Sequence, residues 1–261
     1  LLLQDCLCFI IGFSIWQDAD NQIMEGGKLK GQDTKVDLTA PSADDLIINL
    51  DDLLPGDVLL YRSAKQNIAA KEIATTTGSP YTHAAIYIGN GLLADSMPSS
   101  GIAKRSVSAT LKGARCVAVL RSQAGFGPKR VDALNHFVDM ALEEGSSYDF
   151  LAIFRFKKES KKYFNNQLDF IKQNYSKSKT AEDFSKEDFF CSAFVVACHA
   201  VVGIIDESAQ AAYQPNYFSP GHLLRDPTFG WFLGYLVPKG QTVPDDDPAL
   251  NCTIWRDVTK P

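Results

Sequence analysis

The sequence predicts an α+β fold in which one small antiparallel sheet packs against helices. Several apolar runs have the length of strands, and two of them are joined by Gly89-Asn90-Gly91, a strong hairpin signal. Longer stretches show the apolar spacing of helices. Strands and helices are partly segregated along the chain, whereas alternating βαβ units would predict a parallel sheet.

Five segments are predicted as strands. They are short, rich in apolar residues and bounded by turn residues. Pro55-Gly56, for example, makes the turn before the first of them. The segments are 58–61, 82–88, 92–96, 115–121 and 231–237.

Three segments are predicted as helices. Residues 68–77 are followed by Gly78, and Pro80 prevents the helix from continuing. Residues 129–144 carry apolar side chains at helical spacing, and residues 189–202 form a more apolar helix.

The composition excludes several classes of protein. With 45% hydrophobic and 22% charged residues, the chain of 261 residues is neither disordered nor collagen-like. Its net charge of −5 argues against nucleic acid as the main partner, because phosphate binding needs a basic surface. Six cysteines are too few for a disulfide scaffold. No stretch reaches the roughly 20 apolar residues of a membrane-spanning helix.

The folded body is expected to run from residue 46 to 238. Residues 1–45 contain an apolar run, 7–15, followed by a polar linker with several glycines. The run is interpreted as a buried or membrane-leaning segment or, alternatively, as a targeting remnant. Residues 239–261 are rich in proline and aspartate and are predicted as a tail on the surface.

The stretch 155–186 differs from the rest of the chain in charge. It holds nine basic and four acidic residues, a net charge of +5, which leaves −10 for everything else. One interpretation is a solvated helical insertion. The other is a basic face that makes peripheral contact with an anionic membrane surface or polymer.

Cys191 opens the apolar helix 189–202. The first-turn N–H groups and the helix dipole lower the pKa of a thiol there and favour the nucleophilic thiolate. The backbone N–H of Ser192 would also stabilise an oxyanion. The alternative is a small hydrophobic residue buried beside two phenylalanines. No Cys/His cluster has zinc spacing, so neither a metal site nor a cofactor is expected.

A cysteine nucleophile needs a base, and the chain offers four histidines. His199 is excluded, because eight helical residues place it about 12 Å from Cys191 along the axis. His136 falls inside an amphipathic helix, and His222 lies in a loop and stays a second candidate. His83 starts a strand, where a polar side chain at a sheet rim is unusual unless it is used.

The hairpin register gives His83 a partner. If Ile88 pairs with Leu92, the numbers of facing residues sum to 180, and Asp95 lies diagonally from His83 on one face. A carboxylate there would hold one imidazole nitrogen and fix the tautomer. The alternative is that Asp95 only ends its strand.

Three blocks of sequence resemble a known family. They are LPGDV at 54–58, TGSPYTHAAIYIG at 77–89 and CSAFV at 191–195. In this order they are similar to the YaeF/YiiX-type permuted papain-like amidases, a circularly permuted branch of the NlpC-type cysteine peptidases. The resemblance covers about residues 54–200 and implies a circularly permuted papain-like fold for the catalytic domain 46–238.

The resemblance implies roles for individual residues. Cys191 matches the nucleophile and His83 the general base. Asp95 falls where the family usually has a glutamate, and Ala193 also replaces a common glutamate. Tyr81, two residues before the histidine, is expected to line the cleft or to assist.

The sequence therefore predicts a cysteine hydrolase that works through a thioester on Cys191, with His83 as base and Asp95 orienting it. The resemblance implies an amide substrate in cell-wall peptide and favours a periplasmic, secreted or membrane-associated protein over a cytoplasmic one. Two alternatives stay open. One is a phospholipase or acyltransferase of the same superfamily that acts on membrane lipid, and the other is a non-catalytic binding module.

Overall fold

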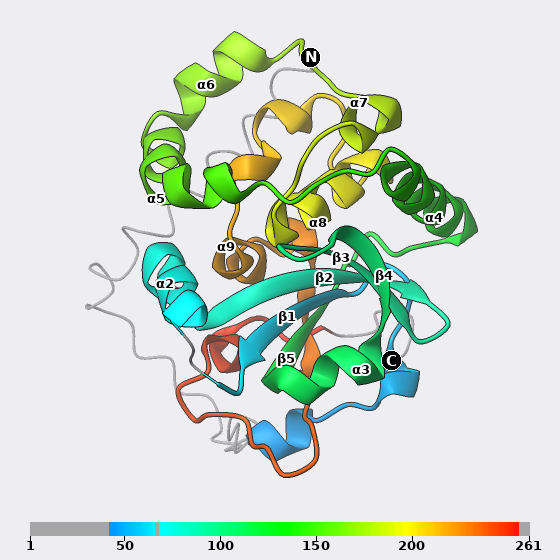
Figure 1. Ribbon diagram of the computed structural model, residues 1–261, viewed down its shortest axis with the longest axis vertical. Coiled ribbons are helices and arrows are strands. Elements are labelled where there is room, and N and C mark those ends of the chain that lie inside the picture. Colours follow the sequence, from blue (N-terminus) through cyan, green and yellow to red (C-terminus); the bar gives the residue numbers. More distant parts are fainter. Residues whose placement is uncertain (1–41, 66–67, 256–261) are drawn as a thin grey trace, which may run out of the picture. The chain divides into compact units, whose positions relative to one another are not determined.

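The structure, a computed structural model, describes residues 42–65 and 68–255 (Figure 1). These residues belong to one structural unit, Pro41–Pro261. The predicted apolar segment 7–15 and the linker up to residue 41 lie outside the described residues. Within the described ranges, no helix is long and apolar enough to cross a membrane.

A six-stranded antiparallel sheet forms the centre of this unit, in the order β4-β3-β2-β1-β5-β6. All five predicted strands are present, and the α+β class is confirmed. An additional edge strand, β4, has the sequence GIAKRS, which contains too few apolar residues to show a strand pattern. The strands are β1 (Val58–Ser63), β2 (Tyr81–Gly89), β3 (Leu92–Met97), β4 (Gly101–Ser106), β5 (Ala114–Arg121) and β6 (Trp231–Leu236).

Helices accompany the sheet on both sides, and the three predicted ones are present. Residues around His222 are helical rather than a loop, because Ser219 caps a short helix by accepting the backbone N–H of His222. The helices are α2 (Ile68–Thr77), α3 (Val107–Thr110), α4 (Pro128–Glu143), α5 (Phe150–Asn165), α6 (Gln167–Asn174), α7 (Ala181–Ser185), α8 (Cys191–Val201) and α9 (Pro220–Arg225).

The larger core lies between the sheet and the layer of α4, α8 and α9 (Figure 1). In this layer Phe137 of α4 stacks on Phe194 of α8, with 5.9 Å between ring centroids. A smaller core on the opposite face includes Val107 of α3. Helix α8 packs directly on β2 and β3, and this contact brings its first residue to the strands that carry the predicted base and its partner.

The segment 155–186 is helical, as predicted, but one side of it is part of the core. Phe156 of α5 and Phe184 of α7 are buried. Tyr163 of α5 is buried too and stacks on Tyr217, with 4.5 Å between ring centroids. This segment is therefore solvated on its outer side only.

The segment from residue 239, predicted as a surface tail, is mostly exposed or half-buried in its described part, but its Asp247 is buried, with 1% exposed. The Asp247 carboxylate accepts hydrogen bonds from the hydroxyls of Tyr81 and Tyr235 and from Nη1 of Arg62, the last at 3.0 Å. Further along, Ile254 forms a parallel bridge to β6. Donors from β1, β2 and β6 therefore hold this segment against the sheet.

Replacing Asp247 by alanine is expected to lower the free energy of unfolding by about 3–5 kcal/mol, because it leaves the buried hydroxyls of Tyr81 and Tyr235 without their acceptor and removes one of the two carboxylates that pair with Arg62. Urea unfolding at neutral pH measures the change. Asp246→Ala is the matched control. Its side chain contacts the same Arg62 but is 80% exposed, so its loss is expected to cost less than about 1 kcal/mol. Equal losses in the two variants would contradict the assignment.

Candidate active site

Cys191 is the first residue of α8, and the chain enters the helix through Phe190 in an extended conformation. The side chain is largely buried, with 6% of the residue exposed. The backbone N–H groups of Ala84 and Ser192 both donate to its sulfur. The predicted donor at Ser192 is therefore in place, and a second one comes from β2.

His83 of β2 forms a hydrogen bond with Cys191. A register shift between β1 and β2 helps to place it, since Tyr61 faces His83 while Arg62 faces Tyr81 and Thr82 is left as the extra residue. Such bulges re-aim side chains at the ends of strands. The bulge depends on pairing with β1, and no local sequence signal predicts it.

Asp95 of β3 lies behind His83, as predicted, and is almost fully buried. Its Oδ2 lies 2.9 Å from His83 Nε2, and its Oδ1 accepts from Arg105 Nε at 2.9 Å. Because Nε2 of His83 faces the carboxylate, Nδ1 is the ring nitrogen that forms the hydrogen bond with Cys191. Arg105 comes from β4, the strand that the sequence pattern does not show, and it was missed for that reason.

The predicted register holds in the interior of the hairpin, where Ile86 faces Ala94. The predicted pair Ile88–Leu92 is wrong, because Leu92 pairs with Gly89 instead. This register shift is confined to the residues next to the turn, between Tyr87 and Gly89. The histidine and the aspartate therefore remain diagonal neighbours on one face.

The electrostatics of the site favour a thiolate beside an imidazolium. Burial alone would raise the pKa of the Cys191 thiol, but the charge and hydrogen bond of His83 and the two backbone N–H groups outweigh it and lower that pKa. Burial likewise opposes protonation of His83, yet Cys191 and Asp95 together raise its pKa to about 10. The shift is toward the thiolate, the form of cysteine that acts as a nucleophile.

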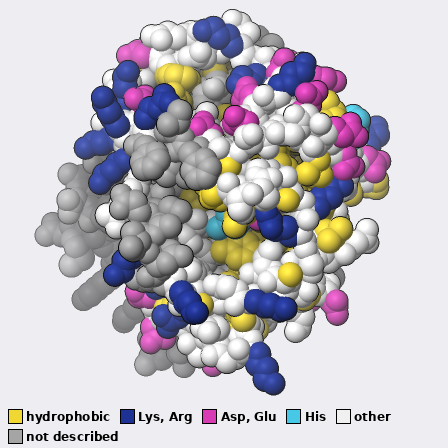
Figure 2. All heavy atoms as spheres, viewed as in Figure 1, with side chains coloured by type: hydrophobic (Ala, Val, Ile, Leu, Met, Phe, Trp, Pro, Cys, Tyr) yellow, Lys and Arg dark blue, Asp and Glu magenta, His cyan; other side chains and the backbone are white. Residues whose placement is uncertain are grey.

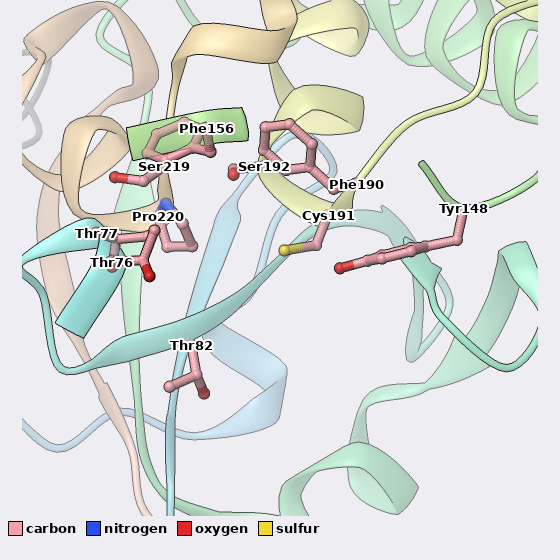
Figure 3. Close-up of a pocket in the computed structure, with 10 residues that line it drawn as sticks. All are labelled: Thr76, Thr77, Thr82, Tyr148, Phe156, Phe190, Cys191, Ser192, Ser219 and Pro220. Carbon is pink, nitrogen blue, oxygen red and sulfur yellow. The ribbon is translucent and has the colours of Figure 1, made fainter. Parts of the chain in front are cut away.

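A pocket opens beside the sulfur of Cys191 (Figure 3). The tyrosine hydroxyl of Tyr148 points toward Cys191 in this view, and burial together with the charge on Cys191 raises the pKa of Tyr148. Neither spacing nor motif identified this tyrosine as part of the site. The described lining residues are Thr76, Thr77, Thr82, Tyr148, Phe156, Phe190, Cys191, Ser192, Ser219 and Pro220.

Tyr81 does not line this pocket, so its predicted role is wrong. Its side chain is fully buried and donates a hydrogen bond to Asp247. Thr82, the bulged neighbour, lines the pocket instead. The hydroxyl of Ser192 is also engaged elsewhere, because it donates to the carbonyl of Phe218 at 2.8 Å, so only the backbone of Ser192 is available to the site.

Of the four histidines, His83 is the one that interacts with Cys191, and the other three have different surroundings. His136 is exposed on α4. His199 is fully buried, which lowers its pKa to about 4, and its Nδ1 contacts the carbonyl of Val195 at 3.0 Å. His222 packs against Phe164, with 4.7 Å between ring centroids, and burial lowers its pKa to about 4 as well.

Comparisons with known proteins add little to this geometry. No family model matches the chain, and no curated protein matches it. Among solved structures it is similar to the crystal structure of the metalloprotein YiiX from Escherichia coli O157:H7, with 15% identity, a TM-score of 0.38, and 74% of this chain and 98% of that chain covered. In the described part of this chain, no group of three or more His, Cys, Asp or Glu side chains could hold a metal ion. The chemistry is therefore argued from the site alone.

Alkylation by iodoacetamide is expected to label Cys191 at pH 6, well below the usual titration range of a thiol, because His83 stabilises the thiolate. His83→Ala is expected to move that reactivity to alkaline pH. Peptide mass spectrometry of rates between about pH 5 and 10 measures both effects. Cys252 is an internal control, since burial raises the pKa of its thiol. Parallel pH profiles for the two cysteines would contradict the ion pair.

Proposed function

We propose that the chain is a cysteine hydrolase with a permuted papain-like arrangement, in which Cys191 forms a thioester with an acyl group. The observation that carries the proposal is the continuous chain of contacts from Cys191 through His83 and Asp95 to Arg105. A nucleophile, a base within hydrogen-bond reach and a third group that orients the base are the geometric signature of covalent catalysis. The histidine precedes the cysteine in the sequence, as in the family that the motifs resemble.

In the first half of the reaction the Cys191 thiolate attacks the carbonyl carbon and forms the carbon–sulfur bond. The carbonyl oxygen becomes an oxyanion, and the backbone N–H groups of Ala84 and Ser192, which lie at the sulfur, are its proposed donors. His83, protonated in the resting pair, gives its proton to the leaving group as the bond to that group breaks.

In the second half a water molecule attacks the thioester carbon, and His83 takes the proton of that water. The carbon–sulfur bond then breaks, which releases the acid and restores the thiolate. Throughout the cycle Asp95 holds Nε2 of His83, so that Nδ1 keeps facing the sulfur. Arg105 in turn fixes the carboxylate.

The substrate is proposed to be an amide in cell-wall peptide, as the resemblance of the motifs implies. One observation favours a second candidate, an ester of a membrane lipid cleaved by a phospholipase or transferred by an acyltransferase. None of the described lining residues of the pocket is Lys, Arg, Asp or Glu, and Phe156, Phe190 and Pro220 form part of its wall. Such a wall suits an apolar acyl chain better than a charged peptide.

Cys191→Ala and His83→Ala are each expected to lower kcat by about 10⁴-fold, since residues that act as one unit lose most of the catalysis when any member is removed. Asp95→Asn is expected to lower kcat by about 10²-fold or more through the wrong tautomer. Asp139→Asn is the matched control, because that aspartate is 54% exposed and, among the residues that the structure describes, pairs only with Lys104. Turnover that survives Cys191→Ala on a substrate of the wild type would refute the mechanism.

The trapped acyl group distinguishes the two substrate classes. After separate incubation with cell-wall and lipid extracts and acid quenching, intact-protein mass spectrometry is expected to show one added mass that Cys191→Ala lacks. A peptide fragment would support the amide, and a fatty acyl mass would support the lipid ester. Absence of any adduct, together with no labelling by thiol-directed activity probes, would leave a binding module.

A further inference from the structure

Helix α5 has two faces of opposite character. Phe156, Ser160 and Tyr163 recur at helical spacing and are buried. Five basic side chains on the other face are exposed, and none of them forms an ion pair with a described residue. They are Arg155, Lys157, Lys158, Lys161 and Lys162.

The next helix, α6, adds exposed apolar side chains beside these cations. Phe170 packs inward against Tyr163, with 5.0 Å between ring centroids. Leu168, Lys172 and Tyr175 lie on the opposite side at spacings of four and three residues, and Leu168 is 57% and Tyr175 56% exposed. Exposed apolar side chains beside a row of lysines are the combination that interfacial helices present to a membrane.

The charge of this region is opposite to that of the rest of the chain. Residues 155–175 hold six basic and two acidic residues, a net charge of +4, whereas the whole chain carries −5. Figure 2 shows Lys and Arg side chains gathered over α5 and α6, at the upper left of the view. An anionic partner is attracted to this face and repelled by the net charge of the rest.

We propose that the outer face of α5 and α6, the basic face defined by the five cations above together with Leu168, Lys172 and Tyr175, docks on an anionic lipid bilayer. Lysines supply the attraction to anionic headgroups, and Leu168 and Tyr175 enter the interface between headgroups and acyl chains. An anionic polymer would use the lysines but has no apolar layer to receive these two side chains.

This orientation brings the bilayer close to the candidate active site. Phe156 lines the pocket of Cys191 from the inner face of α5, and the basic residues lie on the outer face of the same helix. A helix with its side chains is about 10–12 Å in diameter. The pocket therefore lies about one helix diameter from the proposed membrane surface.

Flotation of the full chain with phosphatidylcholine vesicles, with and without about one third phosphatidylglycerol, tests the proposal. We expect binding to the anionic vesicles only. Each lysine at such a surface contributes about fivefold in affinity, so the combined Lys157→Gln, Lys158→Gln, Lys161→Gln and Lys162→Gln variant is expected to bind about 600-fold more weakly than the wild type. A matched control removes four exposed lysines elsewhere, with Lys65→Gln, Lys112→Gln, Lys129→Gln and Lys239→Gln. It is expected to bind within a fewfold of the wild type.

A second variant, Leu168→Ser with Tyr175→Ser, separates a bilayer from a polymer. On vesicles it is expected to lose about tenfold or more in affinity, whereas binding to polyglutamate would not depend on these side chains. Because all the replaced side chains are exposed, circular dichroism and Tm are expected to stay unchanged in every variant. Cys191→Ala is expected to bind vesicles like the wild type, so a failed mechanism and a failed docking surface remain distinguishable.

Three results would overturn the proposal. The first is equal binding to neutral and anionic vesicles. The second is an equal loss of affinity in the lysine control, which would assign the effect to net charge alone. The third is vesicle binding that is unaffected by Leu168→Ser with Tyr175→Ser while polyglutamate competes fully, which would assign the face to an anionic polymer.

Discussion

The Asp95 carboxylate is the constraint on which the rest of the site depends. It is buried, and a buried charge is tolerated only when partners compensate for the lost water. His83 and Arg105 supply two such partners, one on each oxygen. This arrangement requires β2, β3 and β4 to keep one register, because a slip of one residue would turn the carboxylate to the other face of the sheet. The orientation of His83, the proposed base, therefore depends on the pairing of all three strands.

Local signals were sufficient for the part of the site that lies within one hairpin. A tight turn fixes the register between neighbouring strands. This register alone predicts that Asp95 lies diagonally from His83, without any contact from elsewhere in the fold. Arg105 escaped prediction because β4 is an edge strand with basic residues and carries no apolar alternation. The bulge at Thr82 escaped it because a bulge is defined by the partner strand and not by its own sequence.

Long-range contacts explain two features that the sequence interpretation did not anticipate, the buried Asp247 and the position of Tyr81. The run Asp245-Asp246-Asp247 has the composition of a solvated tail. Only the assembled sheet, in which β5 joins β1 to β6, brings Arg62, Tyr81 and Tyr235 together around Asp247. Tyr81 was placed at the cleft because it is close to His83 in sequence. The bulge between them turns Tyr81 into the core, where its hydroxyl serves the carboxylate of Asp247. The bulge at Thr82 thus places Tyr81 in the core and provides one of the hydrogen-bond donors to Asp247.

Helix α5 connects the chemistry to the charge of the surface. Its period of 3.6 residues sends Phe156 into the pocket and the neighbouring lysines to the outside, so a single amphipathic segment lines the site and forms the basic face. The lysines are nevertheless expected to have little effect on the buried ion pair, since they lie on the opposite face of the helix and solvent screens their charge. Substitutions on the outer face are therefore expected to change membrane binding. Substitutions on the inner face are expected to change which acyl groups reach the sulfur of Cys191. For a substrate presented by a bilayer, docking would raise its local concentration and lower the apparent KM, while kcat would continue to depend on the Cys191–His83 pair.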